Sequence, residues 1–246
     1  MKFSLIIPLW NESASVPKLI RAIEESKLPQ IGMKELILVN NASGDNTGTL
    51  IDEAAKSHPW IVPIHLEQNQ NYGGGVYEGF KYARCDIFCY IPGDLQVMPE
   101  DVLKVYHAFL SNLTSKNKLL VKGYRTIRHD PMQTKLISKC YTFLANQLLH
   151  LHIKDVNGLP KMFHRNLMDL IPAERAKTFV FDIQILAIAR THGWIIEEVP
   201  VTFHDRREGK SSWSQKRLQV YWQTFWQTLK VRSLRYKPGI PLKNLR

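Results

Sequence analysis

Long apolar runs are absent from this 246-residue sequence, and cysteine is scarce. A membrane-spanning helix needs about 20 consecutive apolar residues, and no stretch here approaches that length. Cys85, Cys89 and Cys140 have no metal-site spacing and form no even disulfide set, which is typical of a reducing compartment. The first ten residues hold one lysine, a short apolar stretch and no small-residue cleavage site. We therefore expect no signal peptide and a cytoplasmic location.

Acidic residues are missing from the last part of the sequence. No Asp or Glu follows Glu208, whereas nine of the 33 basic residues do. The first 208 residues are nearly neutral, with 24 basic against 22 acidic residues. The net charge of +11 therefore belongs mainly to a cationic tail. Hydrophobic residues make up 44% and charged residues 22%, a balance that excludes a disordered chain.

Short apolar runs alternate with helical patterns of about ten residues. This alternation predicts a single α/β domain over residues 1–205, with a mainly parallel central sheet flanked by helices. The expected strands cover residues 3–7, 36–39, 61–66, 86–91, 119–122 and 194–201. The expected helices begin at Ser15 and Pro99 or cover residues 47–57, 72–83, 134–149 and 181–192. In such sheets, ligands bind beyond the carboxyl ends of the strands.

Four polar segments follow expected strands or open an expected helix. They are residues 7–12 (IPLWNE), 39–47 (VNNASGDNT), 69–75 (NQNYGGG) and 90–96 (YIPGDLQ). The first, second and fourth fall at the carboxyl ends of strands, where their side chains can meet at one edge of the sheet. The glycines of the third segment could admit a phosphate at a helix N-terminus, but we interpret them as close packing.

The order and spacing of these segments resemble the family 2 glycosyltransferases, whose pattern runs I-x-P-x-[YF]-N-E, V-D-[DN]-[GA]-S-x-D-x-T, N-x-G-x-G-G-A and D-x-D-x-Q. Further similarity lies in residues 123–125, 155–161, 198–200 and 206–211, so it covers about residues 3–213. The most similar subgroup is the dolichyl- or polyprenyl-phosphate sugar synthases and their bacterial relatives. The resemblance implies a nucleotide-binding sandwich of the glycosyltransferase A type and an inverting transfer from a nucleoside diphosphate sugar.

The resemblance makes Asp94 and Gln96 the expected metal ligands. A carboxylate and a carbonyl on one face of an extended segment suit Mg²⁺ or Mn²⁺, which neutralises the charge of a leaving diphosphate. The alternative is that Asp94 caps the helix starting at Pro99. Pro92 replaces the first Asp of D-x-D, and Asn40 replaces an Asp that contacts the nucleobase in relatives. We therefore expect metal binding that is weaker or relies more on the diphosphate, and the base preference stays open.

Two further groups of binding residues follow from the resemblance. Pro8, Trp10 and Glu12 resemble a loop that cradles the nucleotide, although Trp10 is explained equally well as a packing aromatic. Basic residues and a serine are placed near an acceptor phosphate, although Lys135 alone also fits a solvated helix face. The expected acceptor-side residues are Arg125, Arg128, Lys135 and Ser138, and Lys161 is a further expected substrate-binding residue.

Asp94, Asp182 and Arg206 are the expected catalytic residues. Asp182 lies where the family places an acid near the acceptor, and a helix N-cap is the alternative. A general base is needed there only if the acceptor is a hydroxyl rather than an ionised phosphate. Arg206 and Ser211 match an R-x-x-G-x-S loop that closes over the donor diphosphate in relatives, where an Arg fork makes two bonds at once. Asp155 is expected to orient neighbouring loops or the acceptor.

Residues 206–246 are expected to hold this mobile loop and a basic, aromatic C-terminal helix. We favour contact of this helix with a membrane surface, because Trp and Tyr prefer the interface and basic residues attract anionic lipids. Docking on the catalytic domain or on a partner subunit is the alternative, and an apolar stripe argues against a nucleic-acid partner. The stripe consists of Leu218, Tyr221, Trp222, Phe225, Trp226 and Leu229.

The sequence thus predicts a metal-dependent hexosyltransferase, peripheral at the inner membrane face. It would move a sugar from a nucleoside diphosphate donor to a lipid-linked acceptor, with polyprenyl phosphate favoured. The alternatives are a transferase acting on a surface polysaccharide or lipopolysaccharide intermediate, and a non-catalytic scaffold, which the departures at Pro92 and Asn40 allow. Intact Asp94, Asp182 and Arg206 argue against the scaffold. The sugar and the oligomeric state stay open.

Overall fold

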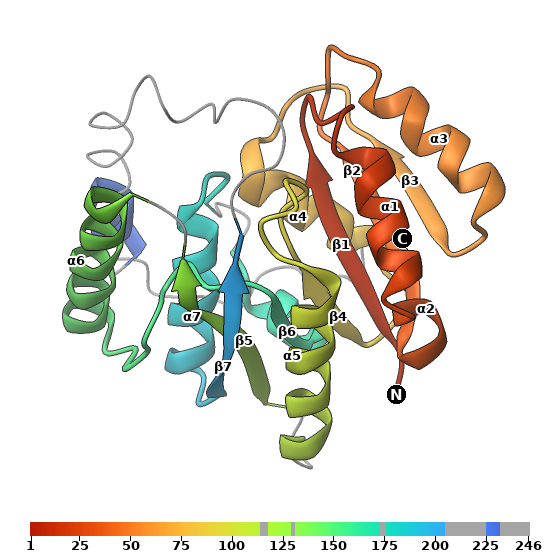
Figure 1. Cartoon of the computed structure of the whole chain (residues 1–246). Helices are drawn as coiled ribbons and strands as arrows, with labels where there is room; N and C mark the ends of the chain where they lie inside the picture. Colours follow the sequence, from red (N-terminus) through yellow and green to blue (C-terminus); the bar gives the residue numbers. More distant parts are fainter. Residues whose placement is uncertain (114–117, 129–130, 173–175, 205–224, 232–246) are drawn as a thin grey trace.

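The computed structural model describes residues 1–113, 118–128, 131–172, 176–204 and 225–231 (Figure 1). Its strands form one seven-stranded sheet in the order β3-β2-β1-β4-β6-β5-β7, flanked by helices. The strands are β1 (Phe3–Leu9), β2 (Met33–Asn40), β3 (Ile61–His65), β4 (Ile87–Tyr90), β5 (Leu119–Arg128), β6 (Lys161–His164) and β7 (Ile195–Phe203). The helices are α1 (Val16–Glu25), α2 (Leu28–Ile31), α3 (Thr47–Ser57), α4 (Asn71–Tyr82), α5 (Pro99–Asn112), α6 (Met132–Leu149), the 3₁₀ helix η1 (Arg165–Leu170) and α7 (Val180–Thr191).

The sheet is mainly parallel, as predicted, with one reversed strand. β1 pairs in parallel with β2 and β4, β2 with β3, and β5 with β7. β6 is antiparallel to both β4 and β5. The sequence analysis missed β6, because this strand has only four residues and begins with Lys161, a charge that does not suggest a buried strand. The other described strands share one direction, so their carboxyl ends lie at the same edge of the sheet.

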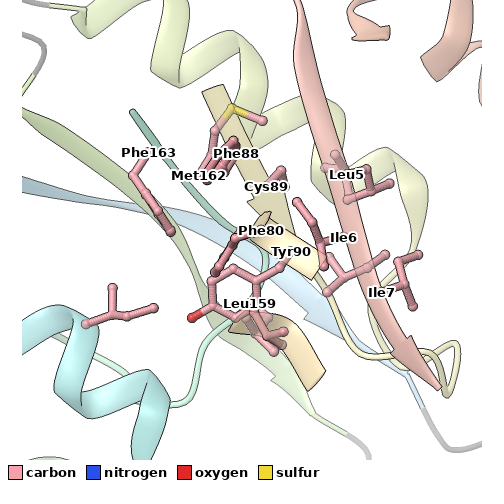
Figure 2. Packing of buried hydrophobic residues seen from close by; sticks show 14 of the residues in the cluster. Leu5, Ile6, Ile7, Phe80, Phe88, Cys89, Tyr90, Leu159, Met162 and Phe163 are labelled. Atoms are coloured by element: carbon pink, nitrogen blue, oxygen red, sulfur yellow. The ribbon is translucent and has the colours of Figure 1, made fainter. Parts of the chain in front are cut away.

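Buried side chains from β1, β4, β6 and α4 form the centre of the core (Figure 2). Every residue of β1 and β4 is buried, which is typical of central strands in a parallel sheet. Phe80 of α4 stacks on Phe88 with 5.1 Å between ring centroids and meets Tyr90 and Phe163 edge-on. This packing fixes the carboxyl end of β4, which leads to Asp94.

Helix α1 follows directly from its local sequence. Its apolar residues Leu19, Ile20 and Ile23 recur at helical spacing and are buried, and a proline lies in its first turn, where the fixed φ suits a helix start. Ser15 is the N-cap residue, as predicted, but its hydroxyl donates to Glu12 Oε2 at 2.7 Å instead of accepting from a backbone amide. The polar loop after β1 is therefore tied to the start of this helix.

Helices α4 and α7 pack closely through the glycines at the head of α4. A Cβ on Gly73 would lie 2.4 Å from Phe181 Cβ and 2.6 Å from the Thr178 carbonyl oxygen. Gly74 N donates to Lys177 O at 3.0 Å, which ties α4 to the segment before α7. The geometry agrees with the interpretation of these glycines as packing residues.

We expect Gly73→Ala to destabilise the fold by about 1–3 kcal/mol, although alanine favours a helix over glycine by about 1 kcal/mol. The added methyl group has to displace a backbone carbonyl and a buried ring. Urea unfolding measures the difference from the wild type. Gly44→Ala is the matched control, since nothing lies within 4 Å of a Cβ at that position. Equal stability of the Gly73→Ala variant and the wild type would contradict the close packing.

A helical segment of the tail, residues 225–231, docks on the catalytic domain. Thr228 is buried, and its hydroxyl lies 2.9 Å from the Tyr141 hydroxyl. Thr178 donates to Gln227 Oε1 at 2.7 Å. This segment therefore follows the alternative prediction, docking on the catalytic domain, rather than membrane contact. Trp226 is nevertheless 49% exposed. The stripe residues Leu218, Tyr221 and Trp222 lie outside the described residues.

Within the ranges given above, no helix is both long and apolar enough to cross a membrane.

Candidate functional site

The loops after β1 and β2 are joined side by side at the carboxyl edge of the sheet. Asn11 N donates to Ser43 Oγ at 3.0 Å, and Gly44 N donates to Asn11 Oδ1 at 2.8 Å. Asp45 Oδ1 accepts from Thr47 N at 3.0 Å, which fixes the start of α3. Two of the polar segments found in the sequence therefore form one platform, made of residues 10–13 and 40–47.

Three expected nucleotide contacts lie in or next to this platform. Pro8 is buried near the end of β1, and Glu12 is half-buried. The Glu12 carboxylate accepts from the Ser15 hydroxyl, and the backbone amide of Glu12 donates to Thr47 Oγ1 at 2.9 Å. Trp10 is 47% exposed, so it is not a packed core aromatic and its ring is accessible to a ligand. Glu12 also ties the loop that presents Trp10 to the residues that begin α1 and α3.

Asn40 ends β2, and both ends of its amide have protein partners. Its Oδ1 accepts from Ser43 N at 3.0 Å, and its Nδ2 lies 3.1 Å from His65 Nδ1. His65 Nε2 in turn lies 2.9 Å from Asp52 Oδ1. This pattern fits a His65 ring protonated on Nε2, which donates to Asp52 and accepts from Asn40 through Nδ1. A carboxylate at residue 40 could not donate to that nitrogen, so the departure from the family pattern has a local structural reason.

Asp94 and Gln96 follow β4, and Gln96 is hydrogen-bonded to His204, the residue after β7. Gln96 N donates to Asp94 Oδ1 at 3.2 Å. His204 N donates to Gln96 O at 3.0 Å, and Gln96 Nε2 donates to His204 O at 3.2 Å. The N-cap residue of α5 is Met98, so the alternative that Asp94 caps this helix is wrong. His204 precedes Arg206 by two residues in the sequence.

The chemistry of this segment fits a magnesium or manganese ion that is shared with a diphosphate. The Asp94 carboxylate is a hard oxygen ligand, and Gln96 donates through Nε2, which leaves Oε1 as a second oxygen. Among the described residues, no three His, Cys, Asp or Glu side chains gather as a metal site. Phosphate oxygens and water would therefore have to complete the coordination, as is usual for magnesium bound with phosphates.

Asp182 lies in the first turn of α7 and forms a buried ion pair with Lys161. The N-cap residue is Phe179, so the N-cap alternative for Asp182 is wrong. Asp182 Oδ1 accepts from the Tyr90 hydroxyl at 2.6 Å and from Lys161 Nζ at 2.7 Å. Burial lowers the pKa of Lys161, and the charge of Asp182 opposes this shift. Burial and the charge of Asp182 together raise the pKa of Tyr90 well above its usual value.

Arg125 on β5 is held by Asp155 through two nitrogens of its guanidinium group. Its Nε lies 2.7 Å from Asp155 Oδ2, and a terminal nitrogen lies 2.8 Å from Oδ1. The same terminal nitrogen donates to Ser138 Oγ of α6 at 3.0 Å. The structure thus joins two expected acceptor-side residues, Arg125 and Ser138, by a direct hydrogen bond, while the Asp155 carboxylate orients the arginine.

A second buried cation, Lys122, supports this arrangement. Its Nζ donates to the carbonyl oxygens of Gly123 and Asp155 and lies 3.1 Å from Glu198 Oε1. Burial lowers the pKa of Lys122 to about 8 against the opposing charge of Glu198. The sequence analysis assigned no role to Lys122 or Glu198. The signal that could have revealed Lys122 is its position at the end of the apolar run of residues 119–121.

Asp155 makes the stability of the fold depend on pH. Burial alone would raise the pKa of Asp155, but the hydrogen bonds and charge of Arg125 and the charge of Lys122 hold it below its usual range. A lowered pKa stabilises the fold above the unfolded-state pKa of about 3.9, and this contribution is lost as pH falls toward the folded-state value. We expect Asp155→Asn to be about 1–3 kcal/mol less stable than the wild type at pH 7. This difference should shrink by about 1.4 kcal/mol per pH unit below about pH 4.

Urea unfolding at pH 7, 4 and 3 measures this difference in stability. Asp86→Asn is the control, because the Asp86 carboxylate is 71% exposed and a small difference from the wild type is expected at every pH. A difference for Asp155→Asn that is the same at all three pH values would contradict the lowered pKa.

The remaining expected residues contribute less to the described geometry. Arg128 ends β5, Lys135 lies in the first turn of α6, and both are half-buried. Arg206, Ser211 and the domain boundary expected at residue 205 lie outside the described residues.

Comparison with known proteins identifies relatives that match most of the chain. The model of the family described as glycosyl transferase family 2 matches residues 4–171. The undecaprenyl-phosphate 4-deoxy-4-formamido-L-arabinose transferase of Pseudomonas fluorescens (strain Pf0-1) is 26% identical over 87% of this chain and 61% of the relative. The protein of the same name from Klebsiella pneumoniae (strain 342) is 25% identical over 88% of this chain and 64% of the relative. The chain thus spans less than two thirds of the length of these curated relatives.

Solved structures share the fold. Glucosyl-3-phosphoglycerate synthase from Mycobacterium tuberculosis, in complex with Mn²⁺, uridine diphosphate and glucosyl-3-phosphoglycerate, matches with a TM-score of 0.72 and 18% identity over 100% of this chain and 92% of that chain. The same enzyme with Mg²⁺ and uridine diphosphate also gives 0.72, at 17% identity over 100% and 92% of the two chains. The expected α/β sandwich of the glycosyltransferase A type is thus confirmed. Since the family model covers more than half of its residues, the chain belongs to glycosyl transferase family 2.

Proposed function

We propose that this chain is an inverting glycosyltransferase that moves a sugar from a nucleoside diphosphate sugar to polyprenyl phosphate at a membrane surface. The observation that carries this proposal is the position of Asp94 and Gln96 after β4. The β1 and β2 loops lie on one side of them in the sheet, and the Arg125–Ser138 pair on β5 and α6 lies on the other. The names of the curated relatives, which join undecaprenyl phosphate and a sugar, support this class of acceptor.

In this proposal, the donor lies along the carboxyl edge from β2 to β4. The accessible ring of Trp10 would contact the nucleotide, and Asp94 and Gln96 are the residues that would hold a metal ion. When bound, the metal neutralises the charge that grows on the leaving diphosphate. His204 is hydrogen-bonded to Gln96, and Arg206 lies two positions after His204 in the sequence. In this proposal, Arg206 and Ser211 would bind the same phosphates.

The buried pair of Asp182 and Lys161 favours an acceptor that needs no general base. A hydroxyl acceptor has to give up its proton, but the Asp182 carboxylate is already bound by Lys161 and Tyr90. The oxygen of an ionised phosphate attacks the anomeric carbon directly. The bond from that carbon to the diphosphate breaks in the same displacement, which inverts the configuration and releases the nucleoside diphosphate. Arg125 and Arg128 provide positive charge for the acceptor phosphate.

An exposed apolar side of α6 supports contact with a membrane surface. Met132, Leu136 and Phe143 are 80%, 62% and 65% exposed, and their spacing places them on one side of the helix. Lys135 and Lys139 lie on the same helix, where they can attract anionic lipids. An interface that receives these side chains would bring a lipid-linked phosphate to the carboxyl edge of the sheet.

The experiment that tests the function is sugar transfer to undecaprenyl phosphate in lipid vesicles. The donors are UDP-glucose and UDP-4-deoxy-4-formamido-L-arabinose, each with Mn²⁺, and the readout is labelled sugar in the lipid. We expect transfer that requires both the metal and the lipid phosphate, and flotation of the protein with anionic rather than neutral vesicles. Transfer only to a hydroxyl-bearing glycolipid would favour the polysaccharide or lipopolysaccharide alternative. A protein that neither binds nor transfers any donor would favour the scaffold.

A further inference from the structure

The hydroxyl of Tyr72 is buried, and the described residues offer it no hydrogen-bond partner. Tyr72 lies in the first turn of α4, directly before the glycines that pack against α7. A buried hydroxyl without a partner costs free energy that the free protein does not recover. Native proteins contain few such groups, so each one has to be explained. A ligand that accepts a hydrogen bond at this position is one explanation.

The ring of Tyr72 is held in one orientation by its neighbours. It stacks on Phe179 with 4.8 Å between ring centroids and 13° between the ring planes. On the same turn of α4, Gly74 N donates to Lys177 O at 3.0 Å, and Lys177 Nζ donates to Gln70 Oε1 at 2.9 Å. The hydroxyl is therefore preorganised, and a ligand that binds it does not have to order the side chain.

Two carboxylates of the candidate site act on this hydroxyl. Burial, the largest cause, and the negative charges of Asp182 and Asp94 raise the pKa of Tyr72 well above its usual value. The hydroxyl therefore keeps its proton at neutral pH and is available as a hydrogen-bond donor. Asp94 belongs to the diphosphate end of the proposed site and Asp182 to its acceptor end. Tyr72 stacks on Phe179, the N-cap residue of α7, and Asp182 lies in the first turn of that helix. This contact places Tyr72 beside the acceptor end of the proposed site.

Three other buried polar atoms among the described residues also have no partner. Tyr72 differs from them because it lies in the first turn of α4, in a polar segment of the candidate site, and the charges of Asp182 and Asp94 both act on it. The others belong to α7 or to the turn before β7. They are Gln184 Nε2, Arg190 Nε and Trp194 Nε1.

We propose that the Tyr72 hydroxyl donates a hydrogen bond to an oxygen of the sugar that is transferred, and so helps to select and position the donor. This inference rests on the proposed function and extends it to recognition of the sugar itself. In the proposed function, Asp94 and Gln96 act on the diphosphate, and neither of them distinguishes one sugar from another. Tyr72 provides a contact that a nucleoside diphosphate without its sugar does not use.

The test is Tyr72→Phe, which removes the hydroxyl and keeps the ring that stacks on Phe179. The full chain with Mn²⁺ is titrated with UDP, UDP-glucose and UDP-4-deoxy-4-formamido-L-arabinose, and dissociation constants are measured by calorimetry. For the sugar donor that the wild type binds more tightly, we expect the variant to bind about threefold to tenfold more weakly. Both proteins should bind UDP equally. Without ligand, the variant should melt at the wild-type temperature or above it, because no hydrogen bond between described residues is lost.

Tyr90→Phe is the matched control for the melting temperature. Its hydroxyl donates to Asp182 in the free protein, so this variant should melt at a lower temperature than the wild type. A lower melting temperature for Tyr72→Phe, or an equal loss of affinity for UDP and for the sugar donor, would give Tyr72 a structural role and overturn the inference. Unchanged affinity for the sugar donor would overturn the inference alone. A wild type that binds none of the three ligands would overturn the proposed function together with the inference.

Discussion

Replacing Lys161 with methionine is expected to lower the free energy of unfolding by about 3–5 kcal/mol. Lys161 Nζ lies 2.7 Å from Asp182 Oδ1, and both side chains are almost completely buried. Removing the ammonium group leaves the Asp182 carboxylate buried without its counter-charge, with the hydrogen bond from the Tyr90 hydroxyl still in place. A buried charge without a counter-charge is far more costly than the net gain from forming the pair. Urea unfolding at pH 7 measures the effect.

A double variant separates the charge effect from a packing effect. Lys161→Met combined with Asp182→Asn removes both charges, and the amide oxygen can still accept from Tyr90. We expect the double variant to be more stable than Lys161→Met alone, since no buried charge remains. If the double variant is no more stable than the single one, loss of the counter-charge does not explain the destabilisation.

Replacing Asp94 with asparagine is expected to lower the rate of sugar transfer roughly 100-fold or more, because metal coordination contributes several kcal/mol to charge stabilisation in such reactions. Asp94 provides the only carboxylate in the proposed pair of ligands, and Gln96 is a neutral and therefore weaker ligand. The variant should also lose the part of its nucleotide affinity that depends on Mn²⁺. Initial rates and calorimetric titrations with and without the metal measure both effects.

Asp86→Asn is the matched control for the Asp94 variant. It makes the same chemical change at a residue that directly precedes β4, whereas Asp94 follows this strand. The Asp86 side chain is 71% exposed and is paired with Arg165 at 3.4 Å. This control should keep the transfer rate and the metal dependence of the wild type. Full metal-dependent activity in the Asp94→Asn variant would place the ion elsewhere.

The fold class could be predicted because the local pattern of the first 112 residues agrees with the tertiary structure. Residues 3–7 and 36–39 form apolar runs that end in Pro8 and Asn40, and the structure places β1 and β2 there. Strand ends were less predictable. β5 continues to Arg128 because it pairs with β7 over nearly its whole length, and no local pattern reveals this pairing.

The candidate site was predictable only where a motif pointed to it. Asp94, Gln96, Asp182 and Arg125 were found through resemblance, and their roles stay predictions. Which of these residues pair with one another could not be predicted this way, because the pairing depends on tertiary contacts. Lys161 reaches Asp182 only because β6 runs antiparallel beside β4.

The orphan hydroxyl of Tyr72 shows the same limit. A tyrosine in a glycine-rich segment carries no sign in the sequence that its polar atom has no partner. That property emerges only when α4, α7 and the end of β4 are brought together.

Thermal unfolding with a panel of nucleoside diphosphates and their sugars, with and without Mn²⁺ or Mg²⁺, tests the central claim most directly. A ligand at about 100 times its dissociation constant adds about 2.7 kcal/mol to the stability, which is readily measured. We predict that at least one nucleoside diphosphate sugar stabilises the protein and that this stabilisation requires the metal and is lost in Asp94→Asn. A melting temperature that no nucleotide changes under any metal condition would contradict a metal-dependent glycosyltransferase and favour a scaffold with the same fold.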